Sequence, residues 1–164
     1  MSQGNTTTLI NEILIDAPPQ AVFDYVSRPD LWHEWHPAST SAELPRVPLK
    51  VGDEFREIIT VKYPLVSVQR QTAYRVTISN PATVWEVQGK SSLFDLTIHY
   101  DFTRVGQGTL FRRTLTYRVH GGLAYFEPLL VRPKIKSQSA AALANLKRRL
   151  EGNGHRPANS IISP

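Results

Sequence analysis

The chain has 164 residues, of which 41% are hydrophobic and 20% charged, values that are ordinary for a single globular domain. It contains no cysteine, which excludes disulfides, thiol nucleophiles and thiolate metal sites. The net charge of +5 favours acidic partners only weakly. A nucleic-acid module would interleave basic and aromatic residues on one surface, so we expect no nucleic-acid binding.

The sequence gives no sign of membrane insertion or export. No apolar run reaches the ~18–20 residues that span a bilayer. The polar stretch from Met1 to Thr8 lacks the basic and apolar regions of a signal peptide. We therefore expect a cytoplasmic protein without a transmembrane segment, present as a monomer or a homodimer.

The first part of the chain predicts a strand followed by two short helices. Imperfect alternation over Thr7–Ala17 indicates the strand. A helix is expected over 18–26, because prolines suit its first turn and its apolar residues recur at helical spacing. Pro29 ends this helix, and 30–35 predicts a second one. The segment 38–52 reads as a loop.

Five further segments predict an antiparallel meander, because short turns connect them in sequence. They are Asp53–Tyr63, Val68–Ser79, Thr83–Gly89, Leu93–Arg104 and Thr109–His120.

The pattern after the last of these strands becomes helical. A continuous helix is expected from Lys134 to Leu150, and the segment before it should be kinked or broken at Pro128 and Pro133. We divide the chain into a tail over 1–6, one domain over 7–151 and a flexible tail over 152–164.

Alternation within the strands separates an apolar face from a polar one, as in a sheet with one wetted side. The aromatic and β-branched residues Phe55, Ile59, Tyr74, Ile78 and Trp85 are among those expected to point inward. Two charged residues, Glu57 and Arg113, fall on the same face. Because a buried charge is costly unless paired, these two residues could form an ion pair with each other or bind polar groups of a ligand. This assignment depends on register, which a single bulge would reverse.

The motifs occur in an order that resembles a known superfamily. The segments that carry the likeness are Ala17–Pro37, Val51–Phe55, Thr83–Val87, Gly106–Leu110 and the long terminal helix. Together they resemble the START-like, or SRPBCC, superfamily, and within it the polyketide cyclase/dehydrase-like branch.

This resemblance implies an α+β helix-grip fold. A curved antiparallel sheet of about six to seven strands would wrap around the C-terminal helix, and two short helices would follow the first strand. It also implies a cavity for an apolar or amphipathic molecule, which strand alternation alone does not establish. The superfamily hosts ligand carriers, lipid-transfer domains and cyclases, so it does not select one activity.

The candidate site consists of the side chains expected to face that cavity. The ligand-binding candidates are Trp32, Trp35, Phe55, Ile59, Tyr74, Trp85, Ile98, Tyr100, Arg113, Tyr117 and Leu143. Glu57 and Arg113 are also the catalytic candidates. A desolvated carboxyl of Glu57 could act as acid or base on an enolisable carbonyl, while Arg113 could stabilise an enolate or bind a carboxylate. The alternative is a structural ion pair.

The aromatic cluster before Pro37 contains two histidines, His33 and His36. They could rim the cavity and supply a general base, or both could be exposed while Trp35 anchors the short helix. No third ligand stands at a fixed spacing from them, so no metal site is predicted. No phosphate loop, dinucleotide fingerprint or nucleophile elbow occurs, and no cofactor is expected.

Three functions remain open at this point. The first is binding of a hydrophobic or amphipathic small molecule, such as a lipid or polyketide. The second is an enzyme of the polyketide cyclase, aromatase or dehydratase type. The third is an interaction protein that uses the basic C-terminal helix or an edge of the sheet.

Overall fold

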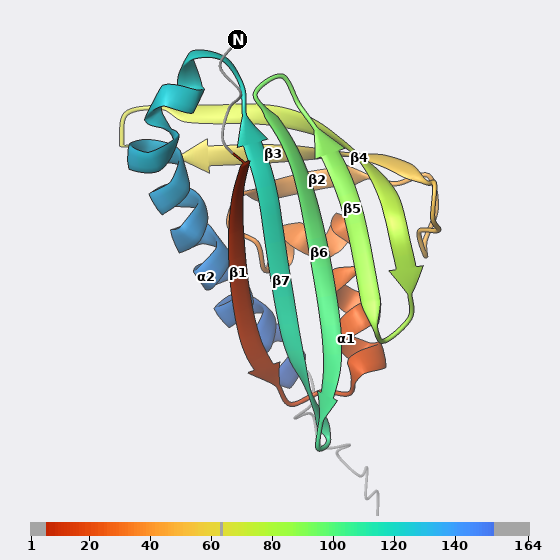
Figure 1. Cartoon of the computed structure of the whole chain (residues 1–164). Helices are drawn as coiled ribbons and strands as arrows, with labels where there is room; N and C mark the ends of the chain where they lie inside the picture. The colour runs from red at the N-terminus through yellow and green to blue at the C-terminus, as the bar shows by residue number, and fades with distance from the viewer. Residues whose placement is uncertain (1–5, 63, 153–164) are drawn as a thin grey trace, which may run out of the picture.

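In the computed structural model, which describes residues 6–62 and 64–152, one antiparallel sheet of seven strands wraps around the C-terminal helix (Figure 1). The strand order is β1-β7-β6-β5-β4-β3-β2. The strands are β1 (Thr6–Ile15), β2 (Ser39–Glu43), β3 (Glu54–Lys62), β4 (Ser67–Asn80), β5 (Val84–Lys90), β6 (Phe94–Val105) and β7 (Gly108–Val119). This architecture confirms the predicted α+β helix-grip fold.

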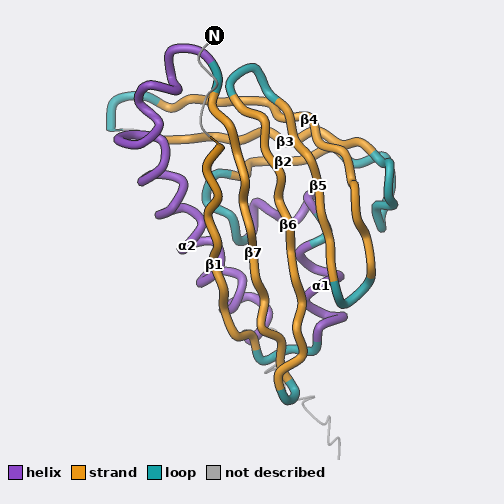
Figure 2. Tube along the Cα trace, viewed as in Figure 1, coloured by secondary structure: helices purple, strands orange, loops and turns teal. Residues whose placement is uncertain are grey.

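The helices are α1 (Pro19–Val26), the 3₁₀ helices η1 (Pro29–Glu34) and η2 (Gly121–Phe126), the π-helical turn η3 (Glu127–Val131) and α2 (Arg132–Gly152). In the view of Figure 2, α1, η1 and part of α2 lie behind the strands, while η2 and η3 lie at the upper left of the molecule. Both α1 and η1 begin at proline, where the missing N–H would have no partner within the helix. Across the described residues no helix is both long enough and apolar enough to cross a membrane.

The segment predicted as a loop contains a strand. Ser39–Glu43 forms β2, which pairs with β3 at the edge of the sheet. Its sequence is short and polar and has no alternation to reveal it. Short polar strands are common at sheet edges, where pairing on one side supplies the backbone hydrogen bonds.

The start of the terminal helix also differs from the expectation. The break expected from the prolines is present, as η2 and η3, but α2 begins at Arg132 rather than Lys134. Pro133 therefore lies in the first turn of α2, where proline is tolerated because its nitrogen needs no partner. Thr6 and Gly152 belong to β1 and α2, and the rest of the two expected tails, 1–5 and 153–164, lies outside the described residues.

A β-bulge in β4 reverses one predicted face. The register between β4 and β5 shifts between Val76 and Ile78. After the shift Ile78 lies opposite Glu86, while Ser79 lies opposite the buried Trp85. Because directly opposed residues share a face of the sheet, Ile78 does not point inward as predicted.

Candidate functional site

A cavity of about 160 Å³ lies between the concave face of the sheet and α2. Since one water takes about 30 Å³ of liquid volume, this space is that of a small molecule such as a single aromatic ring. Strands β3, β4, β6 and β7 line most of it, the segment 32–38 closes one side, and α2 closes another. The lining residues are Trp32, Trp35, His36, Ala38, Glu57, Ile59, Val61, Arg70, Thr72, Tyr74, Ser91, Phe94, Leu96, Ile98, Tyr100, Arg113, Leu115, Ile135, Gln138 and Ser139.

Most of the residues proposed from the sequence meet at this cavity. Those that line it are Trp32, Trp35, Glu57, Ile59, Tyr74, Ile98, Tyr100 and Arg113. The others are buried but do not line it: Phe55, Trp85, Tyr117 and Leu143. Phe55 stacks on Tyr74 at 5.0 Å between ring centroids, and Trp85 stacks on Tyr100 at 5.5 Å. Phe55 and Trp85 therefore hold the rings of Tyr74 and Tyr100, which line the cavity, in place by stacking on them.

Glu57 and Arg113 face the cavity from opposite parts of the sheet, on β3 and β7, and each is 4% exposed. Among the ion pairs of the described residues, none joins the two side chains. Arg113 donates from Nη1 to Ser139 Oγ at 3.0 Å, while its buried Nε has no hydrogen-bond partner in the described part of the chain. The cavity thus contains a buried cation with an unused donor.

The ionisation of the cavity groups follows from their burial. Burial raises the pKa of Glu57 to about 7, although the hydroxyls of Ser39 and Tyr74 and the charge of Arg113 oppose this rise. Burial also raises the pKa of Tyr100 to about 12, and that of Tyr74 well above its ordinary value. At neutral pH both tyrosines are therefore protonated and can donate hydrogen bonds from their hydroxyls. Glu57 is present in both its protonated and its ionised form at this pH.

The structure separates the two histidines of the aromatic cluster. His33 is exposed, whereas His36 lines the cavity. Burial, aided by the charge of Arg113, lowers the pKa of His36 to about 3, so the imidazole is neutral. Its Nδ1 accepts the backbone N–H of Ala38 at 3.3 Å, which leaves the ring proton on Nε2. His36 is thus a neutral donor rather than a general base.

Two features explain why sequence reasoning did not separate these histidines or find Ser139. The helix η1 ends at Glu34, so His33 and His36 do not share a helical face. Ser139 is 1% exposed, but a serine within a basic helix reads as a solvent-facing residue. Only the packing of α2 against β7 shows that Ser139 meets Arg113.

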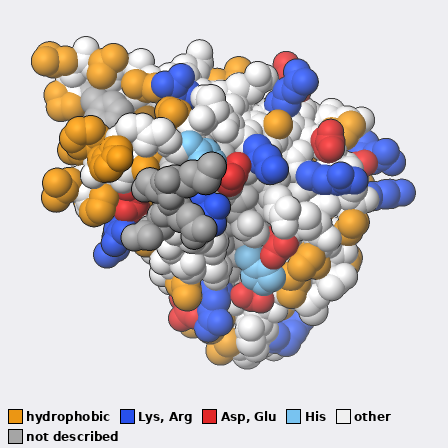
Figure 3. Space-filling view, turned by 45° about the horizontal axis from the view of Figure 1, so that its top comes forward, with side chains coloured by type: hydrophobic (Ala, Val, Ile, Leu, Met, Phe, Trp, Pro, Cys, Tyr) orange, Lys and Arg blue, Asp and Glu red, His pale blue; other side chains and the backbone are white. Residues whose placement is uncertain are grey.

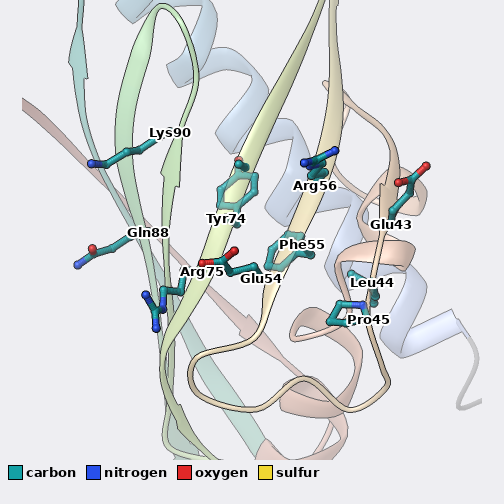
Figure 4. Close-up of a pocket in the computed structure, with 11 residues that line it drawn as sticks. Glu43, Leu44, Pro45, Glu54, Phe55, Arg56, Tyr74, Arg75, Gln88 and Lys90 are labelled. Atoms are coloured by element: carbon teal, nitrogen blue, oxygen red, sulfur yellow. The ribbon is translucent and has the colours of Figure 1, made fainter.

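A larger groove of about 780 Å³ lies on the other side of β3, β4 and β5 (Figure 4). Its polar groups are exposed charges of both signs, and they alternate along the strands with residues that line the cavity. The side chains labelled in Figure 4 are Glu43, Leu44, Pro45, Glu54, Phe55, Arg56, Tyr74, Arg75, Gln88 and Lys90. We assign the candidate site to the inner cavity, because the buried charged residues Glu57 and Arg113 both line it.

The fold and the enclosed cavity define a helix-grip protein. Residues 6–151 match the family model described as polyketide cyclase / dehydrase and lipid transport. The chain belongs to this family.

Solved structures share the fold at low sequence identity. The TTHA0849 protein of Thermus thermophilus has a TM-score of 0.69 and 16% identity, over 90% of this chain and 99% of its own. The Zhui aromatase/cyclase from Streptomyces sp. R1128 has a TM-score of 0.71 and 11% identity, over 94% and 99%. One half of the di-domain ARO/CYC BexL is also similar, with a TM-score of 0.69 and 21% identity, over 93% of this chain and 51% of BexL. A search of curated proteins found no match.

Proposed function

We propose that the protein binds a small amphipathic molecule in the cavity, with an anionic or carbonyl oxygen of that molecule held by Arg113. The observation that carries this proposal is the buried guanidinium of Arg113. Within residues 6–62 and 64–152, its Nε lacks a hydrogen-bond partner and no acidic residue forms an ion pair with it. A buried charge without a counter-charge is costly, so a ligand oxygen that takes this donor would gain a charge-assisted hydrogen bond.

The rest of the lining favours an apolar body for the same ligand. Trp32, Ile59 and Ile98 present hydrocarbon or ring surface, while Tyr100 and His36 add fixed donors beside the cation. Such a lining, mostly apolar with a few convergent polar groups, is typical of small-molecule sites. The family description includes lipid transport, which is consistent with a carrier.

The test uses phenylacetate, a single ring with a carboxylate, and toluene, which lacks the carboxylate. Titration calorimetry would compare the wild type with Arg113→Met. We expect the variant to bind phenylacetate about 10- to 100-fold more weakly, because a hydrogen bond to a charged group is worth about 1.5–3 kcal/mol. Toluene affinity should be unchanged, which controls for an intact cavity. Equal loss of both probes, or no binding of either to the wild type, would contradict the proposal.

A second candidate is an enzyme of the cyclase, aromatase or dehydratase type, favoured by the pKa of Glu57 near 7 in a cavity that Arg113 also lines. In this role the Glu57 carboxylate takes a proton from the carbon next to a carbonyl. The resulting enolate oxygen is held by Arg113 and the hydroxyl of Tyr100. The enolate carbon attacks a second carbonyl of the same substrate molecule, and the oxygen of that carbonyl takes the proton back from Glu57. The printed names of Zhui and BexL describe aromatase/cyclases, and the family description includes cyclases.

Hydrogen–deuterium exchange at carbon separates the carrier from the enzyme. Phenylacetone in D₂O at neutral pH would be followed by NMR with the wild type and with Glu57→Gln. An enzyme of this type should exchange the α-protons, and Glu57→Gln should slow the exchange about 100-fold or more. If phenylacetate binds but neither protein accelerates exchange, the carrier role stands and the catalytic role fails.

A further inference from the structure

Six large apolar side chains protrude at one end of the molecule, and we call them the apolar tip. They belong to the β3–β4 hairpin and to η2 and η3: Leu65, Val66, Tyr125, Phe126, Leu129 and Leu130. Their exposed fractions run from 54% for Phe126 to 99% for Leu65. Figure 3 shows hydrophobic side chains gathered at the upper left of the molecule, where these segments lie. Single exposed apolar residues are ordinary, but a gathered set marks an interaction surface.

The two segments of the apolar tip flank the same end of the cavity. Val61 and Arg70, which precede and follow the hairpin turn, line the cavity together with Ile135 and Gln138 of α2. The hairpin and the start of α2 also lie side by side in Figure 1, with η2 and η3 directly above α2. The exposed apolar surface is therefore continuous with the cavity end rather than scattered over the fold.

The charges around the apolar tip are basic. No acidic residue occurs between Glu57 and Glu86, or between Glu127 and Glu151. These stretches contain the β3–β4 hairpin turn and all of α2 except its last two residues. We call the cations that lie close in sequence to the tip segments the basic flank: Lys62, Arg70 and Lys136.

The acidic groups on adjoining segments are already engaged. Glu127 is ion-paired with Arg132 at 2.8 Å, and Oδ2 of Asp95 lies 3.0 Å from Nε2 of His120. The surface that covers the apolar tip is therefore expected to carry negative charge.

We propose that this end of the molecule docks on the surface of a bilayer that contains anionic phospholipids. The tip side chains protrude from two separate loops, a shape that suits insertion into a deformable interface better than a fit to a rigid groove. Leu, Phe and Tyr are residues that enter the boundary between headgroups and acyl chains, and nearby lysines strengthen attachment to anionic lipids. This inference concerns the outer surface and does not depend on what the cavity binds.

The test is sedimentation of the protein with vesicles of phosphatidylcholine, with and without phosphatidylserine. We expect the wild type to sediment with the phosphatidylserine vesicles, to bind pure phosphatidylcholine at least about tenfold more weakly, and to be released as salt is raised. The double variant Leu65→Ser/Leu129→Ser should weaken partitioning at least about tenfold, because two apolar side chains no longer enter the interface. Lys62→Glu/Lys136→Glu should abolish the preference for phosphatidylserine.

The matched control is Leu14→Ser/Val105→Ser, which removes two exposed apolar residues from the opposite end of the molecule, at the end of β1 and the β6–β7 turn. This variant should sediment with vesicles as the wild type does, and all variants should keep the wild-type circular dichroism spectrum and melting temperature. Failure of the wild type to bind phosphatidylserine vesicles would overturn the proposal. So would binding of these vesicles by the tip variant, Leu65→Ser/Leu129→Ser, as strongly as by the wild type. Concentration-dependent dimerisation that the tip variant abolishes, without vesicle binding by the wild type, would assign the tip to a second copy instead.

Discussion

At the scale of single residues, the cavity concentrates groups whose ionisation is set by burial. Arg113 and Glu57 are both almost fully buried, yet no ion-pair contact between them is present. A packed core gains nothing from this arrangement, because each charge must be removed from water. Such a cost is typical of sites retained for binding or chemistry.

Glu57 should make the stability of the protein fall as pH rises. Its pKa moves from 4.5 to about 7 on folding, so the folded state binds more protons between these values. At about 1.4 kcal/mol for each pH unit, the wild type loses about 3 kcal/mol of unfolding free energy across this window relative to Glu57→Gln. Urea denaturation of both proteins from pH 4 to pH 8 measures the difference directly. The control is Glu54→Gln, which removes one exposed carboxylate from the same strand, three positions earlier and outside the cavity lining.

At the scale of elements, two backbone segments approach each other closely where β7 begins beside the end of β1. A Cβ on Gly108 would lie 2.6 Å from the carbonyl oxygen of Ile15, which is backbone and cannot rotate away. The absence of a side chain at this position is therefore what allows β1 and the start of β7 to pair so closely.

Replacement of this glycine should weaken the sheet. We expect Gly108→Ala to lower the unfolding free energy by about 1–3 kcal/mol, because the strands must separate to admit the methyl group. Gly122→Ala is the matched control, since its Cβ meets nothing within 4 Å, and it should be neutral or slightly stabilising. Thermal denaturation of the two variants provides the comparison. Equal melting temperatures would show that β1 and β7 can part at no cost.

At the scale of the whole molecule, the buried carboxylate of Glu127 links the first strand to the last strand and to the terminal helix. Glu127 accepts hydrogen bonds from Thr7 of β1 at 3.1 Å, from the hydroxyl of Tyr117 of β7 at 2.5 Å and from Arg132 of α2 at 2.8 Å. The hydrogen bonds from Arg132, assisted by those from Tyr117 and Thr7, lower the pKa of this carboxyl despite its burial. The network holds the first strand, the last strand and the terminal helix at fixed positions.

Loss of this carboxylate should destabilise the whole fold. Glu127→Leu removes four hydrogen bonds, two of them from Arg132, and leaves buried donors unpaired. We therefore expect a cost of about 2–4 kcal/mol in urea denaturation at neutral pH. Glu12→Gln is the control, because Glu12 pairs with Arg112 between the same two strands but at the exposed surface, where such pairs contribute about 0–1 kcal/mol. A cost no larger than that of Glu12→Gln would mean that the network adds nothing beyond a surface pair.

The sequence determined the class of fold and much of the cavity lining. Period-two alternation placed Tyr74, Tyr100 and Ile98 on one face, and turn residues between the strands predicted an antiparallel meander. These features are local, because they depend on which side of a strand a residue occupies and on how few residues join two strands.

Tertiary structure alone decided the remaining features. The bulge that turns Ile78 outward, the edge strand β2 and the contact between Ser139 and Arg113 all depend on partners distant in sequence. Whether Glu57 and Arg113 pair with each other was open for the same reason, since register fixes a face but not the distance across a curved sheet. Alternation specifies direction, whereas the space left between side chains is a property of the whole packed fold.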